Sequence, residues 1–187
     1  DHARAVVAAV EPRSSFLTRP PVANATCVLV AVAVEQPAFD PDQVSRFLLT
    51  AEQTGLHVLL VLTKCDLLEP EELDQLKRRL QGWGYEPLLV STQSGMGLEA
   101  LRVQLASATI SVLCGPSGVG KSSLLNGLLP GLTLRVGAVS GRLQRGRHTT
   151  RHVELHAIAP GARVADTPGF NRPELPDDVR LSLIHIS

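Results

Sequence analysis

Apolar runs and amphipathic stretches alternate along the chain, which predicts alternating strands and helices. Residues 28–34 form an uninterrupted, valine-rich apolar run of the kind found in central parallel strands. Apolar residues within 44–51 then recur at the i, i+3, i+4, i+7 spacing of a helix that Asp40 or Asp42 can cap. The alternation continues with expected strands at 57–62, 86–90 and 109–114, and with expected helices at 70–80, 98–105 and from Lys121 onward.

Three strand–helix units therefore lead into a glycine-rich loop, and this order predicts an α/β fold with a doubly wound, mostly parallel sheet. Two later strand-like segments, 153–158 and 162–165, are joined by the turn Pro160-Gly161 and predict an antiparallel hairpin at the sheet edge. Residues 131–151 show no apolar periodicity and are expected to form a mobile loop. A chain of 187 residues can build one such domain with a short appendage, but not two complete domains.

The glycine-rich loop matches the phosphate-binding pattern G-x-x-x-x-G-K-S/T, and it lies between a predicted buried strand and a predicted helix, as that pattern requires. Glycines let successive backbone N–H groups turn toward a phosphate, and the following helix adds the positive end of its dipole. Lys121 is expected to reach the β- and γ-phosphates, and the Ser122 hydroxyl is expected to ligate Mg²⁺. The predicted phosphate-binding residues are Gly115, Pro116, Ser117, Gly118, Val119, Gly120, Lys121, Ser122, Ser123 and, from a later motif, Gly169.

Two loops are candidates for reading the base, and each follows a predicted strand at the edge where doubly wound folds bind ligands. Asp66 can accept hydrogen bonds from guanine N1–H and the N2 amino group, a donor pair that adenine lacks, and the stem of Lys64 can lie over the base. The segment from Thr63 to Asp66 resembles the N/T-K-x-D element of GTPases, although Thr63 stands where Asn is commoner; alone, such a segment also fits an ordinary surface loop. The second loop contains Ser91 and Thr92, where a backbone N–H is expected to meet guanine O6.

Asp166-Thr167-Pro168-Gly169 looks like the D-x-x-G element of GTPases, in which Asp166 would hold Mg²⁺ through water and the Gly169 N–H would face the γ-phosphate. Phe170 follows, where many GTPases carry a glutamine that orients the attacking water. His148 is the candidate replacement, and the alternative is an exposed histidine without a role. The predicted catalytic residues are His148, Lys121, Thr149 and Thr150, and the predicted Mg²⁺ ligands are Ser122, Thr149, Thr150 and Asp166.

The motif order is circularly permuted, because the base loops at 63–66 and 91–95 precede the phosphate loop at 115–122, whereas ordinary GTPases have the phosphate loop first. With this order, and with Gly-Arg-His-Thr-Thr and Asp-Thr-Pro-Gly-Phe, the chain resembles the RsgA/YjeQ family of small-subunit-dependent ribosome GTPases over residues 5–173. It departs from the family pattern at Thr63 and at Arg151, where a third threonine is common. The resemblance implies a monomeric, cytoplasmic enzyme that uses Mg²⁺ with GTP and releases GDP, stimulated by the 30S ribosomal subunit late in that subunit's maturation, with contacts to 16S rRNA.

The resemblance also divides the chain into three expected parts. Residues 1–22 would be the remnant of a preceding OB-fold and linker, 23–173 the permuted GTPase domain, and 174–187 a truncated tail. Family members carry a zinc-binding domain after the GTPase, so Zn²⁺ is expected only in that C-terminal domain, which this chain lacks. The last residues, 181–187, resemble a translated sequencing-adapter end and are expected to be non-native.

Composition and charge fit this reading. The longest apolar run is far shorter than the roughly 20 residues of a membrane span, and we expect no membrane association. The three cysteines are far apart and beside apolar runs, which favours buried thiols in a reducing cytosol. Residues 35–99 contain eleven acidic and five basic side chains, whereas residues 100–153 contain seven basic and no acidic ones. The basic stretch either binds a polyanion or is one basic face of the domain without such a partner. Arg142, Arg145, Arg147 and Arg151 either contact rRNA phosphates or serve only nucleotide and solvent.

Two alternatives remain at the level of the sequence. A permuted GTPase family that acts on the large subunit shares the motif order, but its phosphate loop usually reads G-x-P-N-V-G-K-S, and Ser117-Gly118 replaces Pro-Asn here. The other alternative is a GTP-dependent binding module with negligible turnover. Phosphate release in the presence of 30S subunits discriminates between a module and an enzyme.

Overall fold

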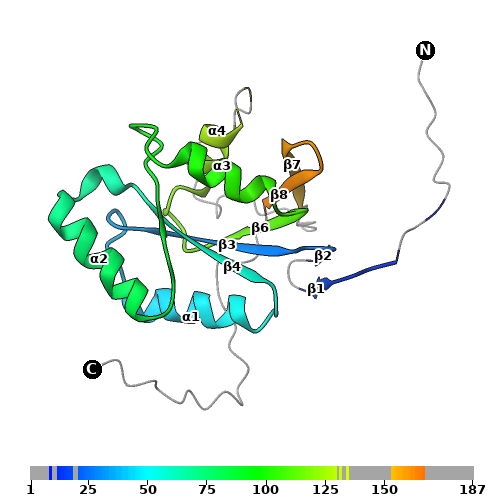
Figure 1. Cartoon of the computed structure of the whole chain (residues 1–187), viewed down its shortest axis with the longest axis horizontal. Coiled ribbons are helices and arrows are strands. Elements are labelled where there is room, and N and C mark those ends of the chain that lie inside the picture. Colours follow the sequence, from blue (N-terminus) through cyan, green and yellow to red (C-terminus); the bar gives the residue numbers. More distant parts are fainter. Residues whose placement is uncertain are drawn as a thin grey trace, which may run out of the picture.

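The computed structural model describes residues 9, 12–18, 21–129, 131, 134 and 153–166. These residues form a six-stranded sheet with helices on both faces, and a separate two-stranded hairpin at one end (Figure 1). The predicted α/β class is confirmed. Within the described residues, no helix is both long enough and apolar enough to span a membrane.

The sheet has the strand order β5-β4-β3-β6-β8-β7. All neighbouring pairs are parallel except β7 and β8, which form the antiparallel edge hairpin expected from the Pro160-Gly161 turn. The strands are β3 (Cys27–Ala33), β4 (His57–Thr63), β5 (Leu88–Leu89), β6 (Ile110–Cys114), β7 (Glu154–Ala159) and β8 (Ala162–Asp166). The predicted strand at 86–90 is therefore shorter than expected, because its ladder to β4 pairs only two residues.

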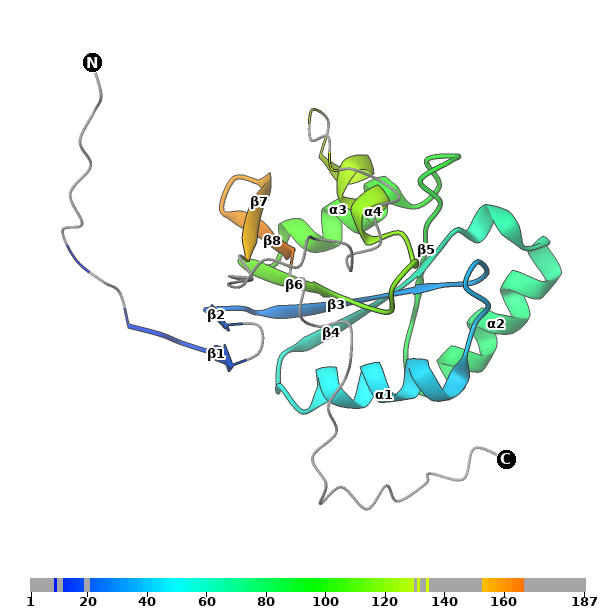
Figure 2. The ribbon, with the colours of Figure 1, turned by 180° about the vertical axis from the view of Figure 1, so that it is seen from behind.

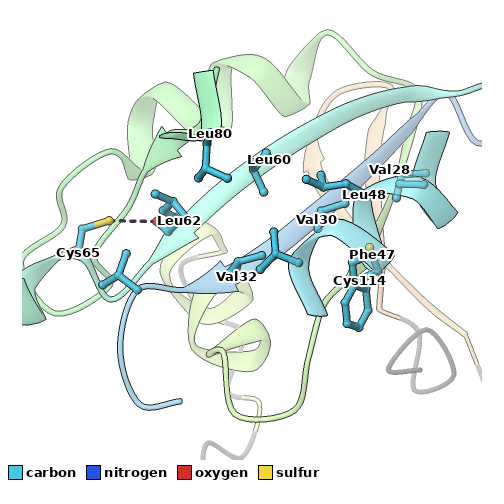
Figure 3. Packing of buried hydrophobic residues seen from close by; sticks show 13 residues of the cluster. Val28, Val30, Val32, Phe47, Leu48, Leu60, Leu62, Cys65, Leu80 and Cys114 are labelled. Carbon is cyan, nitrogen blue, oxygen red and sulfur yellow. Dashed lines mark hydrogen bonds between the residues drawn. The ribbon is translucent and has the colours of Figure 1, made fainter. Parts of the chain in front are cut away.

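Helices cover both faces of the sheet, as the pattern predicts. Helices α1 (Pro41–Glu52) and α2 (Pro70–Gly82) lie on one face, and α3 (Leu98–Ala106) and α4 (Lys121–Leu128) lie on the other (Figure 1, and from behind in Figure 2). Successive side chains of a strand point to opposite faces, so the buried strand β3 contributes to two cores. Val28, Val30 and Val32 join the core under α1 and α2, which Figure 3 shows, and Leu29, Ala31 and Ala33 join the core under α3 and α4.

The first two helices begin where the sequence predicts. Asp40 caps α1, since its carboxylate accepts a hydrogen bond of 3.0 Å from the Asp42 backbone N–H. Glu69 caps α2 in a reciprocal capping box with Glu72, and Pro70 occupies the first turn. Both helices therefore begin at a carboxylate N-cap residue.

A short hairpin near the start of the chain was not predicted. It consists of β1 (Phe16–Thr18) and β2 (Pro21–Ala23), and its Leu17 and Val22 pack with Val112 and Ala165 of the main sheet. Strands of three residues are too short for apolar alternation to identify them. The residues between 12 and 22 that the structure describes thus contact the main sheet directly.

Candidate nucleotide-binding site

The described parts of all the predicted motifs gather at one edge of the sheet, where parallel strands end together. The phosphate loop follows β6, Thr63 ends β4, and Asp166 ends β8. Ser91 reaches the same edge after β5, because the Val90 N–H donates to the Leu62 carbonyl at 2.8 Å. The carboxyl edge of such a sheet is where doubly wound folds bind their ligands.

The phosphate loop runs against the backbone of β3, and its first glycine is required there. Gly115 has a φ of 141°, and a Cβ at this position would lie 2.1 Å from the Ala31 carbonyl oxygen. Gly118 and Gly120 also have positive φ, at 85° and 92°. Helix α4 begins directly after Gly120, so the loop leads into a helix N-terminus, which favours an anion.

Lys121 lies over this loop. Its Nζ donates hydrogen bonds to the carbonyls of Gly115 at 2.7 Å and Pro116 at 2.8 Å. Burial lowers the pKa of Lys121, while Cys114 and the Asp166 carboxylate act in the opposite direction. The cation is therefore partly desolvated and within electrostatic reach of Asp166, a setting in which phosphate oxygens would be favourable partners.

Thr63 connects the first base loop to the phosphate loop. Its side chain is buried, and its Oγ1 lies 2.6 Å from the Val119 carbonyl oxygen and 3.2 Å from the Val32 carbonyl oxygen. The hydroxyl thus binds the backbone in the place where an asparagine amide is commoner. Its predicted contact with guanine stays a prediction.

Lys64 makes a second connection. It has a left-handed φ of 59°, and its Nζ donates to the carbonyls of Gly118, at 2.9 Å, and of Gln36. Gln36 lies in the segment between β3 and α1, which sequence reasoning did not assign to the site. Its position after the carboxyl end of a central strand is the signal that could have identified it.

The other residues predicted to read the base differ in exposure. Asp66 is exposed in the short 3-10 helix η1 (Cys65–Leu67), directly after Lys64. Ser91 is buried, and its hydroxyl accepts hydrogen bonds from the backbone N–H groups of Gln93 and Ser94, at 3.2 and 3.1 Å, whereas Thr92 is exposed. The Ser91 hydroxyl therefore shapes its own loop, while Asp66 and Thr92 lie where a ligand can reach them.

Two of the predicted Mg²⁺ ligands are described, and their chemistry fits that ion. Ser122 lies in the first turn of α4, and Asp166 ends β8, where its carboxylate acts to raise the pKa of Lys121 against the larger effect of burial. Protein sites usually hold Mg²⁺ through one or two carboxylates together with water and substrate phosphates. In the part of the chain that the structure describes, no group of three or more His, Cys, Asp or Glu side chains is placed to hold a metal.

Four predicted site residues lie outside the described residues: His148, Thr149, Thr150 and Gly169. Their predicted roles stay predictions, as does the mobile loop expected over 131–151, of which only Gly131 and Leu134 are described.

The sheet is mostly parallel, a glycine loop enters a helix, and the segments predicted to read the base come earlier in the chain. Together these features are those of a circularly permuted P-loop GTPase domain. The family model described as RsgA GTPase matches residues 10–176, and the chain belongs to this family. This membership favours the small-subunit family over the large-subunit family considered above.

The relatives are close but longer than this chain. "Small ribosomal subunit biogenesis GTPase RsgA" of Synechococcus sp. (strain CC9311) is 75% identical over 96% of this chain and 59% of its own length. The protein of the same name from Prochlorococcus marinus (strain MIT 9303) is 67% identical over 95% of this chain and 55% of its own length. The chain thus spans less than two thirds of these relatives.

Solved structures show the same fold. YjeQ from Thermotoga maritima is 34% identical, with a TM-score of 0.72 over 90% of this chain and 56% of its own. YloQ, described as a circularly permuted GTPase, is 32% identical, with a TM-score of 0.63 over 88% of this chain and 51% of its own. The permuted order read from the motifs is thereby confirmed as a property of the fold.

Proposed function

We propose that the protein carrying this chain hydrolyses GTP to GDP and phosphate, and that it acts in the maturation of the small ribosomal subunit. The observation that carries the proposal is the pair of side chains joining the base segment to the phosphate loop. Thr63 Oγ1 lies 2.6 Å from the Val119 carbonyl oxygen, and Lys64 Nζ lies 2.9 Å from that of Gly118. Two such contacts hold a base site and a phosphate site at a fixed separation, as one nucleotide spanning both requires.

In this proposal Asp66 selects guanine, helped by the stem of Lys64 and by the backbone near Thr92. Asp66→Asn should shift preference from GTP toward xanthosine triphosphate, because an amide can donate to the carbonyl at C2 of xanthine. We expect GTP affinity to fall about 100-fold, since a charged, two-bond contact is lost. Competition binding with the two nucleotides measures the shift, and Glu71→Gln, an exposed charge change on α2, is the control. Unchanged selectivity would remove Asp66 from the base site.

The residues around the phosphates would then catalyse the hydrolysis. Lys121 would hold the β- and γ-phosphates, Ser122 and Asp166 would hold Mg²⁺ with Thr149 or Thr150, and the Gly169 N–H would face the γ-phosphate. The bound Mg²⁺ would neutralise developing charge on the phosphate oxygens.

His148 is proposed to position the attacking water, because Phe170 offers no hydrogen-bonding group. His148→Ala should lower kcat by about 100-fold and change GTP affinity by less than about threefold. Single-turnover hydrolysis and equilibrium nucleotide binding measure the two quantities. Equal turnover in the two proteins would discard this role.

The proposed partners are GTP and GDP, the 30S subunit and its 16S rRNA, with the protein acting as a cytoplasmic monomer. The names of the relatives, which refer to small-subunit biogenesis, and the basic stretch of residues 100–153 support this proposal. Two further parts of the proposal are the division of the chain into residues 1–22, 23–173 and 174–187, and the binding of Zn²⁺ by a following domain. Metal analysis of a full-length protein tests the zinc.

The whole proposal is tested by measuring phosphate release from a full-length protein carrying this chain, with and without 30S subunits. We expect turnover to rise at least about tenfold with 30S subunits and to stay unchanged with 50S subunits. Nucleotide binding without any stimulation would instead support the GTP-dependent binding module.

A further inference from the structure

The turn between β3 and α1 contains a residue with an unusual backbone conformation. Gln36 has a φ of 52°, in the left-handed region that residues other than glycine, asparagine and aspartate rarely adopt. In the part of the chain that the structure describes, three non-glycine residues have positive φ: Asn24, Gln36 and Lys64. Two of these three, Gln36 and Lys64, are the partners of one hydrogen bond. Backbone strain of this kind is concentrated at functional sites, because it persists only where the surrounding structure holds it.

The turn lies beside both halves of the candidate nucleotide site. The Val34 N–H donates to the Thr63 carbonyl at 3.1 Å, so the turn begins next to the end of β4. On the phosphate side, a Cβ added at Gly118 would lie 3.5 Å from Pro37 Cδ. The turn ends at Asp40, whose carboxylate caps α1. It is therefore held at both ends and lies next to the phosphate loop.

The ammonium of Lys64 joins the turn to that loop. Its Nζ donates to the Gln36 carbonyl and, at 2.9 Å, to the Gly118 carbonyl. An ammonium has three donor hydrogens, so two carbonyl acceptors fix the direction of the side chain and leave one donor. A lysine side chain has many rotamers, and holding it in one of them before a ligand arrives removes that ordering cost from binding.

We infer that Gln36 is a positioning residue for guanine-nucleotide binding, whose left-handed backbone aims its carbonyl at Lys64 and so directs the lysine stem proposed to lie over the base. This inference rests on the proposed function, through the place given there to Lys64. It adds the turn between β3 and α1 as a third segment of the site. Because the contact uses a backbone carbonyl, residue 36 acts through the φ that it permits, which glycine adopts freely and a β-branched residue does not.

The test measures GDP and GTP affinity for Gln36→Val and Gln36→Gly in a full-length protein carrying this chain. We expect Gln36→Val to bind both nucleotides about tenfold more weakly, because valine disfavours the left-handed conformation, and Gln36→Gly to stay within about twofold of the parent. At saturating GTP, kcat should stay within about threefold in both variants, because the contact acts on binding. Gln36→Ala, with a loss of about fourfold, supplies the comparison if the valine variant does not fold.

Asn24 provides the matched control, because its φ is 59° but it precedes β3, at the opposite end of that strand from Gln36. Comparing valine with glycine at each position separates the cost of positive φ from the loss of the native side chain. Asn24→Val should unfold at a lower denaturant concentration than Asn24→Gly, while the two bind GDP within about twofold of each other. An equal loss of affinity at the two positions would indicate a general effect of stability and would overturn the proposal.

A double-mutant cycle with Lys64→Met separates positioning from a merely structural role, because methionine keeps an apolar stem but has no ammonium for Gln36 to direct. We expect Gln36→Val to lower GDP affinity about tenfold in the parent and less than about twofold in the Lys64→Met background. Equal losses in both backgrounds, or no loss in the parent, would contradict the assigned role. If the parent binds guanine nucleotides but hydrolyses no GTP, the proposed function fails while these affinities still decide the role of Gln36; a parent that binds no guanine nucleotide overturns both.

Discussion

The two segments predicted to read the base lie at the same sheet edge but are held in different ways. Residues 63–66 are fastened to the phosphate loop through the side chains of Thr63 and Lys64. Residues 91–95, with Met96 and Gly97 that follow them, are fastened mainly to one another, since the Ser91 hydroxyl accepts from amides of its own loop and the Ser91 N–H donates to the Met96 carbonyl. A displacement of the phosphate loop should therefore move the first segment and should move the second much less.

The difference also separates two ways of building a binding loop. The first segment depends on contacts between parts of the chain more than fifty residues apart, such as Thr63 with Val119. The second depends on local geometry, above all at Gly97, which has a φ of 71°. Breaking the second should cost folding stability, and breaking the first should cost nucleotide binding.

The largest effect is expected at Gly97. A Cβ there would lie 1.9 Å from the Leu89 carbonyl oxygen, in addition to the strain of its positive φ. Gly97→Ala should lower the free energy of unfolding by about 4 kcal/mol. Gly95→Ala is the matched control, because Gly95 also has positive φ, at 83°, but has nothing within 4 Å of its Cβ position, and it should cost about 1 kcal/mol. Denaturant unfolding measures both, and equal losses would contradict the assigned close approach.

An intermediate effect is expected at Thr63. Thr63→Val keeps the shape of the side chain but removes the hydroxyl. The buried Val119 carbonyl then loses its hydrogen bond from residue 63. We expect GDP affinity to fall about tenfold, with a loss of about 1–2 kcal/mol in stability. Thr63→Ser should restore most of the affinity. Equal affinity in the valine variant and the parent would show that this contact does not couple the two loops.

The smallest effect is expected at Thr92, whose side chain is exposed. Its proposed contact with guanine uses a backbone N–H, which a change of side chain preserves. Thr92→Ala should change the unfolding free energy by less than about 0.5 kcal/mol and GTP affinity by less than about threefold. Calorimetric titration checks the affinity, and a tenfold loss would assign the contact to the hydroxyl instead.

Much of the fold could be predicted because its signals are local. The buried run at β3, the cap at Asp40 and the turn before β8 depend on neighbours within a few residues. The hairpin of β1 and β2 escaped prediction because its strands have three residues each, and the length of β5 was overestimated because pairing, not sequence, ends that strand.

The candidate site was predictable as a set of residue types but not as a set of contacts. The spacing of the glycines, Lys121 and Ser122 identifies a phosphate loop from sequence alone. The contact of Lys64 with Gln36 was not predictable, because a backbone carbonyl carries no residue-type signature. The same reason hid a contact of Asn126, whose carboxamide donates to the Leu134 carbonyl and accepts from the Leu134 backbone N–H, each at 2.9 Å.

The sequence by itself determined the order of strands and helices, the phosphate loop and the permuted order of its motifs, since each follows from periodicity or short spacing. Only the tertiary structure decided that the Thr63 hydroxyl is used on Val119 and that Lys64 binds two loops at once. Parallel strands bring their carboxyl ends together whatever their separation along the chain, so contacts made at that edge are set by the packing of the sheet.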